Sequence, residues 1–285
     1  MATPSPTLRR ILTRRDLILY GLVILTPTAP FPVYGIVQQT SFGHAALSYV
    51  VAMVAMLFTA ASYGKMSSAF PSAGSTYTYA QRALDPHIGF LAGWAMILDY
   101  FLIPLLSVIY AALTANRLAP AVPYSVWAVL FTVAITATNI RGIRVTARAG
   151  NVMMALMTAC AALFVIVGVR WLTARTGLSG LLDASALYDA GTFQLRPLML
   201  GAGIASLSYI GFDAISTLAE DTVHPERDIS MATVTVCILQ TLFCVAIVYV
   251  AALVWPDWRT YPESETVILD IGRKAGGAWM MGFIT

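Results

Sequence analysis

The chain has 285 residues, of which 58% are hydrophobic and only 11% are charged. Soluble domains carry about 25% charged residues, so this composition excludes water as the solvent for most of the surface. The net charge of +3 comes with no basic face suited to nucleic acid. We therefore expect a lipid bilayer, and no nucleic acid, as the surroundings of the chain.

Apolar runs long enough to cross a ~30 Å hydrocarbon layer as helices recur along the sequence. They predict an all-α membrane protein with seven spans and the start of an eighth near Ala278. A short surface helix is expected between Thr266 and Lys274. The spans, numbered in chain order, are predicted at residues 17–37, 46–63, 88–113, 124–140, 151–171, 198–218 and 231–255.

The arginines predict the orientation of the chain in the membrane. Three arginines lie in the short connection 141–150, whereas none lies in the connection 38–45. We therefore predict a multi-pass protein of the inner (plasma) membrane with a cytoplasmic N-terminal tail at residues 1–16. The more polar segment 172–197 is then an extracytoplasmic connection.

Span 1 contains a run of residues that is incompatible with a regular helix, Thr26-Pro27-Thr28-Ala29-Pro30-Phe31-Pro32. Each proline lacks an N–H group and clashes with the preceding turn. The carbonyls that are freed need partners, and lipid offers none. An ordinary proline kink is the alternative, but the clustering of prolines favours an unwound segment that faces a ligand.

Span 6 carries a second suspected break in the stretch from Gly201 to Asp213, which is rich in glycine and serine. These residues are poor in helix interiors but also permit close helix packing, so both interpretations stay open for span 6 alone. The pairing of the two breaks is more informative. Spans 1 and 6 run in opposite directions, and two interrupted helices of opposite direction are typical of inverted-repeat transporters.

Two carboxylates lie within apolar spans, Asp99 in span 3 and Asp213 near the end of span 6. An ionisable group at the middle of a membrane helix costs about 2.5–3.5 kcal/mol. No lysine or arginine lies deep enough in a span to neutralise them. Each is then either protonated in a hydrogen bond between helices or paired with a cation from outside. Two such carboxylates favour a cationic substrate.

Signatures of enzymes and metal sites are absent from the sequence. It contains no Walker-type loop and no Ser/His/Asp arrangement. The three cysteines, Cys160, Cys237 and Cys244, lie in apolar runs, which favours small buried residues over a disulfide or a metal site. We expect a protein that is not an enzyme, with no catalytic residue, no metal site and no cofactor.

Two stretches resemble the motifs of a transporter family. The run Phe70 to Tyr79, continued by Gly89-Phe90 and Gly93-Trp94, resembles the P-x-A-G-G-x-Y-x-Y…G-F…G-W signature of the amino acid–polyamine–organocation permeases. Gly211-Phe212-Asp213, followed by Ala219 to Ile229, resembles their G-F-[ED]…A-E-E…P-x-R-x-I-P stretch. The stretch from Tyr63 to Ser75, together with Leu98-Asp99-Tyr100, is especially similar to bacterial putrescine importers of that family.

The resemblance implies a LeuT-like inverted-repeat fold. Residues 17–171 then form the first five-helix repeat, and residues 198–285 form helices 6, 7 and the start of helix 8. Family members are longer and carry further helices, so we expect the chain to be truncated after about seven helices.

The same resemblance implies a substrate site on the unwound first helix, the third helix and the sixth helix. Its predicted residues are Thr26, Pro27, Thr28, Ala29, Phe31, Asp99, Tyr100, Ser206, Leu207, Ser208 and Tyr209. Asp213 matches a carboxylate implicated in proton coupling, and Leu207 stands where the family often has an aromatic gate.

The sequence therefore predicts a secondary active transporter that imports a small cationic amine, such as putrescine, by symport with a proton or a sodium ion. One alternative is a permease for neutral or cationic amino acids, whose substrate carboxylate would bind helix dipoles at the break in span 1. A second alternative is a truncated fragment that does not transport and acts at most as a membrane binding module.

Overall fold

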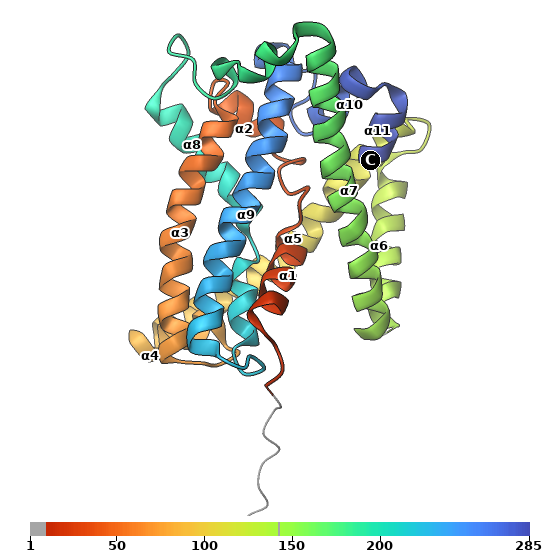
Figure 1. Cartoon of the computed structure of the whole chain (residues 1–285). Coiled ribbons are helices and arrows are strands. Elements are labelled where there is room, and N and C mark those ends of the chain that lie inside the picture. Colours follow the sequence, from red (N-terminus) through yellow and green to blue (C-terminus); the bar gives the residue numbers. More distant parts are fainter. Residues whose placement is uncertain (1–9, 142) are drawn as a thin grey trace, which may run out of the picture. The chain divides into compact units, whose positions relative to one another are not determined.

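The computed structural model describes residues 10–141 and 143–285, with the side chains of 143–151 outside the description. Residues 1–9 of the predicted tail also lie outside it. The α-helices, shown in Figure 1, are α1 (Arg14–Leu25), α2 (Tyr34–Thr40), α3 (Ala45–Ala69), α4 (Ser75–Ala83), α5 (Pro86–Leu118), α6 (Tyr124–Ile140), α7 (Ile143–Thr176), α8 (Leu195–Ala205), α9 (Pro225–Val254), α10 (Val267–Gly276) and α11 (Ala278–Ile284). Short 3₁₀ helices are η1 (Leu178–Leu182), η2 (Ala184–Ala186), η3 (Ser206–Tyr209), η4 (Phe212–Leu218) and η5 (Trp258–Thr260).

The predicted spans correspond to helical segments of the structure. Within the described residues, five stretches are long and apolar enough to cross a membrane, namely Ala45–Ala69, Pro86–Leu118, Val152–Thr176, Leu195–Leu218 and Pro225–Val254. The shorter apolar helix α6 matches predicted span 4, and span 1 is divided between α1 and α2. Helix α11 begins at Ala278, where the start of an eighth span was expected.

Most of the connection expected at 141–150 is helical, because α7 begins at Ile143, whereas the candidate span within it begins at Val152, next to the predicted start at 151. Backbone hydrogen bonding continues the helix beyond its apolar run, and alanine and arginine favour helix formation. The side chains of Arg144 and Arg148, which contributed to the predicted orientation, lie outside the described residues.

The chain divides into two compact units, and the first includes residues 10–25, 54–101 and 209–240. In this unit α1 packs against η4, so the first part of span 1 lies beside the last part of span 6. Gly211 has a φ of +102°, and a Cβ there would lie 2.4 Å from Ile24 Cγ2. Only glycine permits both this left-handed turn and the close approach to α1.

The beginning of the described chain is attached to the segment that follows span 6, within the same unit. The backbone N–H groups of Ile11 and Leu12 donate to the Asp221 carbonyl at 2.8 and 3.0 Å. Arg14 donates from Nε and Nη2 to Asp228 Oδ1, at 3.0 and 2.8 Å. These contacts fix the start of α1 against the start of α9.

The second unit comprises Thr26–Met53, Leu102–Ser208 and Thr241–Thr285. Here α2 packs against α8, so the second part of span 1 lies beside the first part of span 6. A Cβ at Gly201 would lie 2.8 Å from the side chains of Ser41 and Ser48. The glycine therefore allows close packing at this contact.

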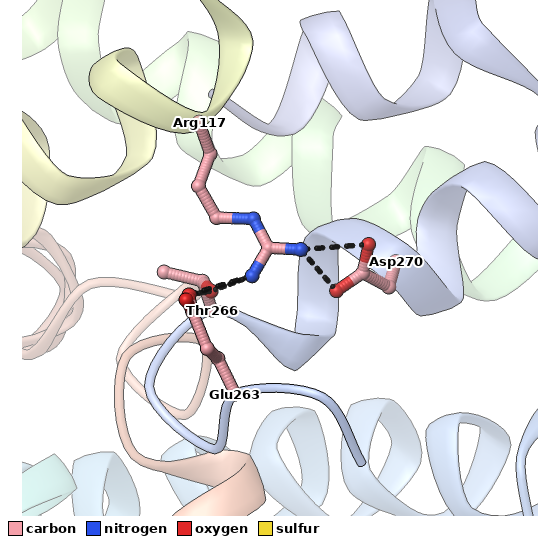
Figure 2. Close-up of polar contacts among 4 residues, drawn as sticks. All are labelled: Arg117, Glu263, Thr266 and Asp270. Carbon is pink, nitrogen blue, oxygen red and sulfur yellow. Dashed lines mark hydrogen bonds and ion pairs between the residues drawn. The ribbon is translucent and has the colours of Figure 1, made fainter. Parts of the chain in front are cut away.

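The end of α5 and helix α10 are connected in the second unit by Arg117 (Figure 2). Arg117 Nη1 donates to Glu263 Oε2 at 2.7 Å and to Thr266 Oγ1 at 2.8 Å. Its Nη2 donates to both oxygens of Asp270, at 3.1 and 2.8 Å. The predicted surface helix is thus present as α10, but one of its faces is buried, with Val267, Ile268, Leu269 and Ile271.

Candidate functional site

The break in span 1 is present. Helix α1 ends at Leu25, α2 begins at Tyr34, and the ribbon between them is irregular in Figure 1. Thr26 has a positive φ of 52°. Turn hydrogen bonds take the place of helical ones, with the Ala29 N–H donating to the Thr26 carbonyl at 3.1 Å. The predicted interruption by clustered prolines is confirmed.

The end of α1 receives a partner from α9. The carbonyl of Leu25, the last residue of α1, accepts a hydrogen bond from Gln240 Nε2 at 3.2 Å, and Gln240 is fully buried. A helix end away from water needs such a partner for its carbonyls. Gln240 was not among the predicted residues, although a lone amide in the apolar run 231–255 was a signal for it.

The break in span 6 is also present. Helix α8 ends at Ala205 and is followed by the 3₁₀ turns η3 and η4, separated at Gly211. Both interpretations of this stretch, an interrupted helix and close helix packing, therefore apply. The α-helix is interrupted, and Gly201 and Gly211 also pack closely against neighbouring segments.

Asp99, Tyr100 and Asp213 come together in the first unit, from α5 and η4. Tyr100 Oη donates to Asp213 Oδ2 at 3.4 Å. Asp99 lies within electrostatic reach of Asp213, and Tyr63 of α3 lies within electrostatic reach of both. We call these four residues, Tyr63, Asp99, Tyr100 and Asp213, the acidic cluster. Both carboxylates are partly buried.

No cation of the described chain neutralises the acidic cluster. The ion pairs within the described residues lie elsewhere: Arg14 pairs with Asp228, and Arg117 pairs with Glu263 and Asp270. The same residues contain no group of three or more His, Cys, Asp or Glu that could hold a metal. Two carboxylates beside tyrosine rings and hydroxyl groups form a suitable environment for an organic ammonium ion.

Tyr63 is the member of the acidic cluster that the prediction missed. Its hydroxyl group is hydrogen-bonded to Thr76 Oγ1, and its ring packs edge-on against Tyr79 and Phe212. The ring centroids of Tyr63 and Phe212 are 5.3 Å apart. The sequence placed Tyr63 at the end of span 2, but only the fold shows that it packs against Phe212 of span 6.

The other predicted site residues have varied surroundings. Phe31 is buried and packs against Phe164, with ring centroids 5.5 Å apart. Ser208 is buried and hydrogen-bonded to Tyr49 Oη at 2.9 Å. Tyr209 is fully buried in the first unit, whereas Leu207 is 47% exposed. The second unit contains Thr26, Pro27, Thr28, Ala29, Phe31, Ser206, Leu207 and Ser208. Substrate contact by these residues stays a prediction.

Comparison with known proteins identifies a family. The profile of the amino acid permease family matches residues 31–274. The chain is 33% identical over 277 residues to the low-affinity putrescine importer PlaP of Escherichia coli K12, covering 96% of this chain and 61% of that protein. It is 28% identical over 264 residues to the methylthioribose transporter of Bacillus subtilis, covering 85% of this chain and 55% of that protein. The branched-chain amino acid permease BcaP of B. subtilis is 27% identical over 305 residues, covering 98% of this chain and 62% of that permease.

The chain belongs to the amino acid permease family. It is an all-α integral membrane protein with the transporter fold of that family, in which spans 1 and 6 are interrupted. It spans 55% to 62% of the length of these three relatives.

Proposed function

We propose that the chain is part of a secondary transporter that imports a small cationic amine, similar to putrescine, together with a proton. The observation that carries this proposal is the acidic cluster. Asp99 and Asp213 lie within electrostatic reach of one another, and neither forms an ion pair within the described residues. The similarity to a protein named a putrescine importer supports the same substrate class.

In this mechanism Asp99 binds an ammonium group and Asp213 carries the coupling proton. Tyr100 holds Asp213 by its hydrogen bond and offers its ring to the alkyl chain of the amine. Enclosing an unpaired charge away from water is costly. The site therefore closes most readily when the ammonium ion neutralises one carboxylate and the proton neutralises the other. This requirement couples amine transport to proton transport.

An amino acid is the second candidate substrate, because several relatives are named amino acid permeases. The carboxylate of such a substrate would bind the helix dipoles at the break in span 1. Competition between putrescine and amino acids in one uptake assay separates the two candidates.

We also propose the topology that the sequence predicted. Residues 17–171 form the first five-helix repeat, residues 172–197 an extracytoplasmic connection, and residues 198–285 the beginning of the second repeat. The tail 1–16 is cytoplasmic, and the membrane is the inner membrane. Cysteine labelling from either side at positions in 10–16 and in 183–191 tests this topology, and labelling of both from one side contradicts it.

The test of function is uptake of radiolabelled putrescine by cells without their own putrescine uptake. Both the 285-residue chain and any longer product of its gene are assayed, which also tests whether the chain transports by itself. Asp99→Asn is expected to raise the KM by about 30-fold or more, because removing one partner of a buried charge pair costs at least roughly 2 kcal/mol. Asp213→Asn is expected to abolish the dependence of uptake on the proton gradient.

Asp221→Asn is the matched control, because the Asp221 side chain lies outside the acidic cluster, and it is expected to leave uptake unchanged. An unchanged KM in Asp99→Asn contradicts the role of Asp99 in binding. Uptake that amino acids block and putrescine does not would favour the amino acid permease.

A further inference from the structure

The second unit contains a group of tryptophans and basic residues at the end of α7. The Trp171 ring is approached by two cations, with Arg175 Cζ 4.2 Å and Lys274 Nζ 5.7 Å from its centroid. Lys274 comes from α10 and also lies 4.9 Å from the centroid of Trp255. Two like charges are thus held on one aromatic residue.

An open groove of about 320 Å³ runs beside this group. It is lined by Val167, Arg170 and Trp171 of α7, by Ala275 of α10 and by Trp279 of α11. Its walls are indole rings and small apolar side chains, and Arg170 is its charged lining residue. The groove therefore combines apolar and indole side chains with the basic Arg170, and Arg175 and Lys274 lie next to it on the Trp171 ring.

Among the described residues, no acidic side chain pairs with the positive charges at this groove. Within the described residues, Arg170, Arg175 and Lys274 take part in no ion pair. The carboxylates of Glu263 and Asp270, on or next to α10, are bound to Arg117 instead. Partial burial and the charge of Arg175 lower the pKa of Lys274, as expected where cations are close and no acid relieves them.

We infer that this groove, the Trp171 groove, binds the phosphate headgroup of an anionic membrane phospholipid. The candidate span Val152–Thr176 of α7 ends five residues after Trp171, which is the position expected for a tryptophan near the boundary between hydrocarbon and water. Tryptophan and basic side chains at that boundary are typical contacts of lipid headgroups. Arg170, Arg175 and Lys274 supply donors for the phosphate, and Val167 supplies apolar surface for an acyl chain.

Cation–π contact alone is the competing explanation for the arrangement, and the chain offers a control for it. Arg259 Cζ lies 4.5 Å from the centroid of Trp258, in the same unit but outside the Trp171 groove. Arg259→Gln removes a charge from the face of Trp258, whereas Lys274→Gln removes a charge from Trp171 and Trp255. Only the second change removes a charge next to a residue that lines the groove.

The test is native mass spectrometry of the purified chain titrated with phosphatidylglycerol or with neutral phosphatidylcholine. Phosphatidylglycerol is expected to bind more tightly. Arg175→Gln and Lys274→Gln are each expected to weaken its binding about fivefold, because each basic residue near an anionic lipid contributes about 1 kcal/mol. Arg259→Gln is expected to bind like the wild type, and Lys274→Arg is expected to retain binding.

Equal binding of the two lipids would overturn the proposal. So would an equal loss in Arg259→Gln and Lys274→Gln, or complete displacement of phosphatidylglycerol by inorganic phosphate, which would show a site for a soluble anion. Circular dichroism of each variant verifies that its helical content is retained, and the inference does not depend on the transported substrate.

Discussion

Carboxylates occur in two opposite settings in this protein. In the second unit Glu263 and Asp270 surround Arg117, which donates to both of them and to Thr266. In the first unit Asp99 and Asp213 lie within electrostatic reach of each other, Asp213 accepts a hydrogen bond from Tyr100, and neither has a basic partner within the described residues. Carboxylates thus have a cationic partner in one region and, within the described residues, none in the other.

The difference teaches which carboxylates are available for function. A carboxylate held by the fork of an arginine has its charge and hydrogen bonds supplied by the protein, so it stabilises the connection between α5 and α10. A pair of carboxylates without a cation lacks a positive counter-charge, which only a proton or a ligand can supply. The Arg117 network is therefore structural, whereas the acidic cluster is suited to binding.

The largest expected effect on stability comes from removing the cation of the satisfied region. Arg117→Met leaves Asp270, whose side chain is only 16% exposed, without its partner. We expect a loss of about 2 kcal/mol in the free energy of unfolding, below the 3–5 kcal/mol of a fully buried pair because the network is partly solvated. The thermal unfolding midpoint in detergent measures it.

Two further variants sharpen this result. Arg117→Lys keeps the charge but loses the two-pronged geometry, so its midpoint is expected between those of the wild type and Arg117→Met. Arg196→Met removes an exposed arginine that forms no ion pair within the described part of the chain. It is expected to change stability by less than about 0.5 kcal/mol, and an equal loss there would contradict the special role of Arg117.

The same substitution made in both regions is expected to act in opposite directions. Asp270→Asn removes the charge that Arg117 binds and is expected to cost about 1 kcal/mol of stability, within the range of charge-assisted hydrogen bonds. Asp99→Asn removes one of two like charges, so the midpoint is expected to stay unchanged or rise. Thermal unfolding of both variants in one buffer makes the comparison. A fall of the Asp99→Asn midpoint as large as that of Asp270→Asn would show that Asp99 has a structural counter-charge.

The smallest effect concerns pH. Hydrogen bonds from Arg117 and Thr266 hold the pKa of Glu263 below its ordinary value. A carboxyl group whose pKa is lower in the folded state stabilises the protein above its unfolded pKa of about 4.3, and this contribution is lost as the pH falls through the folded value. Because the side chain is 60% exposed, Glu263→Gln is expected to cost only about 0.3 kcal/mol.

Thermal midpoints of the wild type and Glu263→Gln, measured from pH 7 down to pH 3, are expected to converge at the acid end. Glu265→Gln is the control, because Glu265 lies two residues from Glu263 and its carboxylate forms no ion pair within the described residues. A difference that grows toward low pH would contradict the assignment.

Local chemistry made part of the fold and of the candidate site predictable. Clustered prolines cannot continue a helix, so the break that begins at Thr26 followed from the residues themselves. The connection expected at 141–150 is helical from Ile143 onward, because hydropathy marks where a helix leaves the membrane, and not where it ends. Gln240 and Tyr63 were missed because their roles depend on partners from other helices.

The sequence by itself determined that the chain crosses a membrane, where spans 1 and 6 break, and that Asp99 and Asp213 lie in apolar segments. The tertiary structure alone decided which charges meet. It brought Arg117 to Asp270, 153 residues further along the chain, and Tyr100 to Asp213, 113 residues further along. Hydropathy and helix propensity act between near neighbours in sequence, whereas the pairing of charges depends on contacts that only the packed helices create.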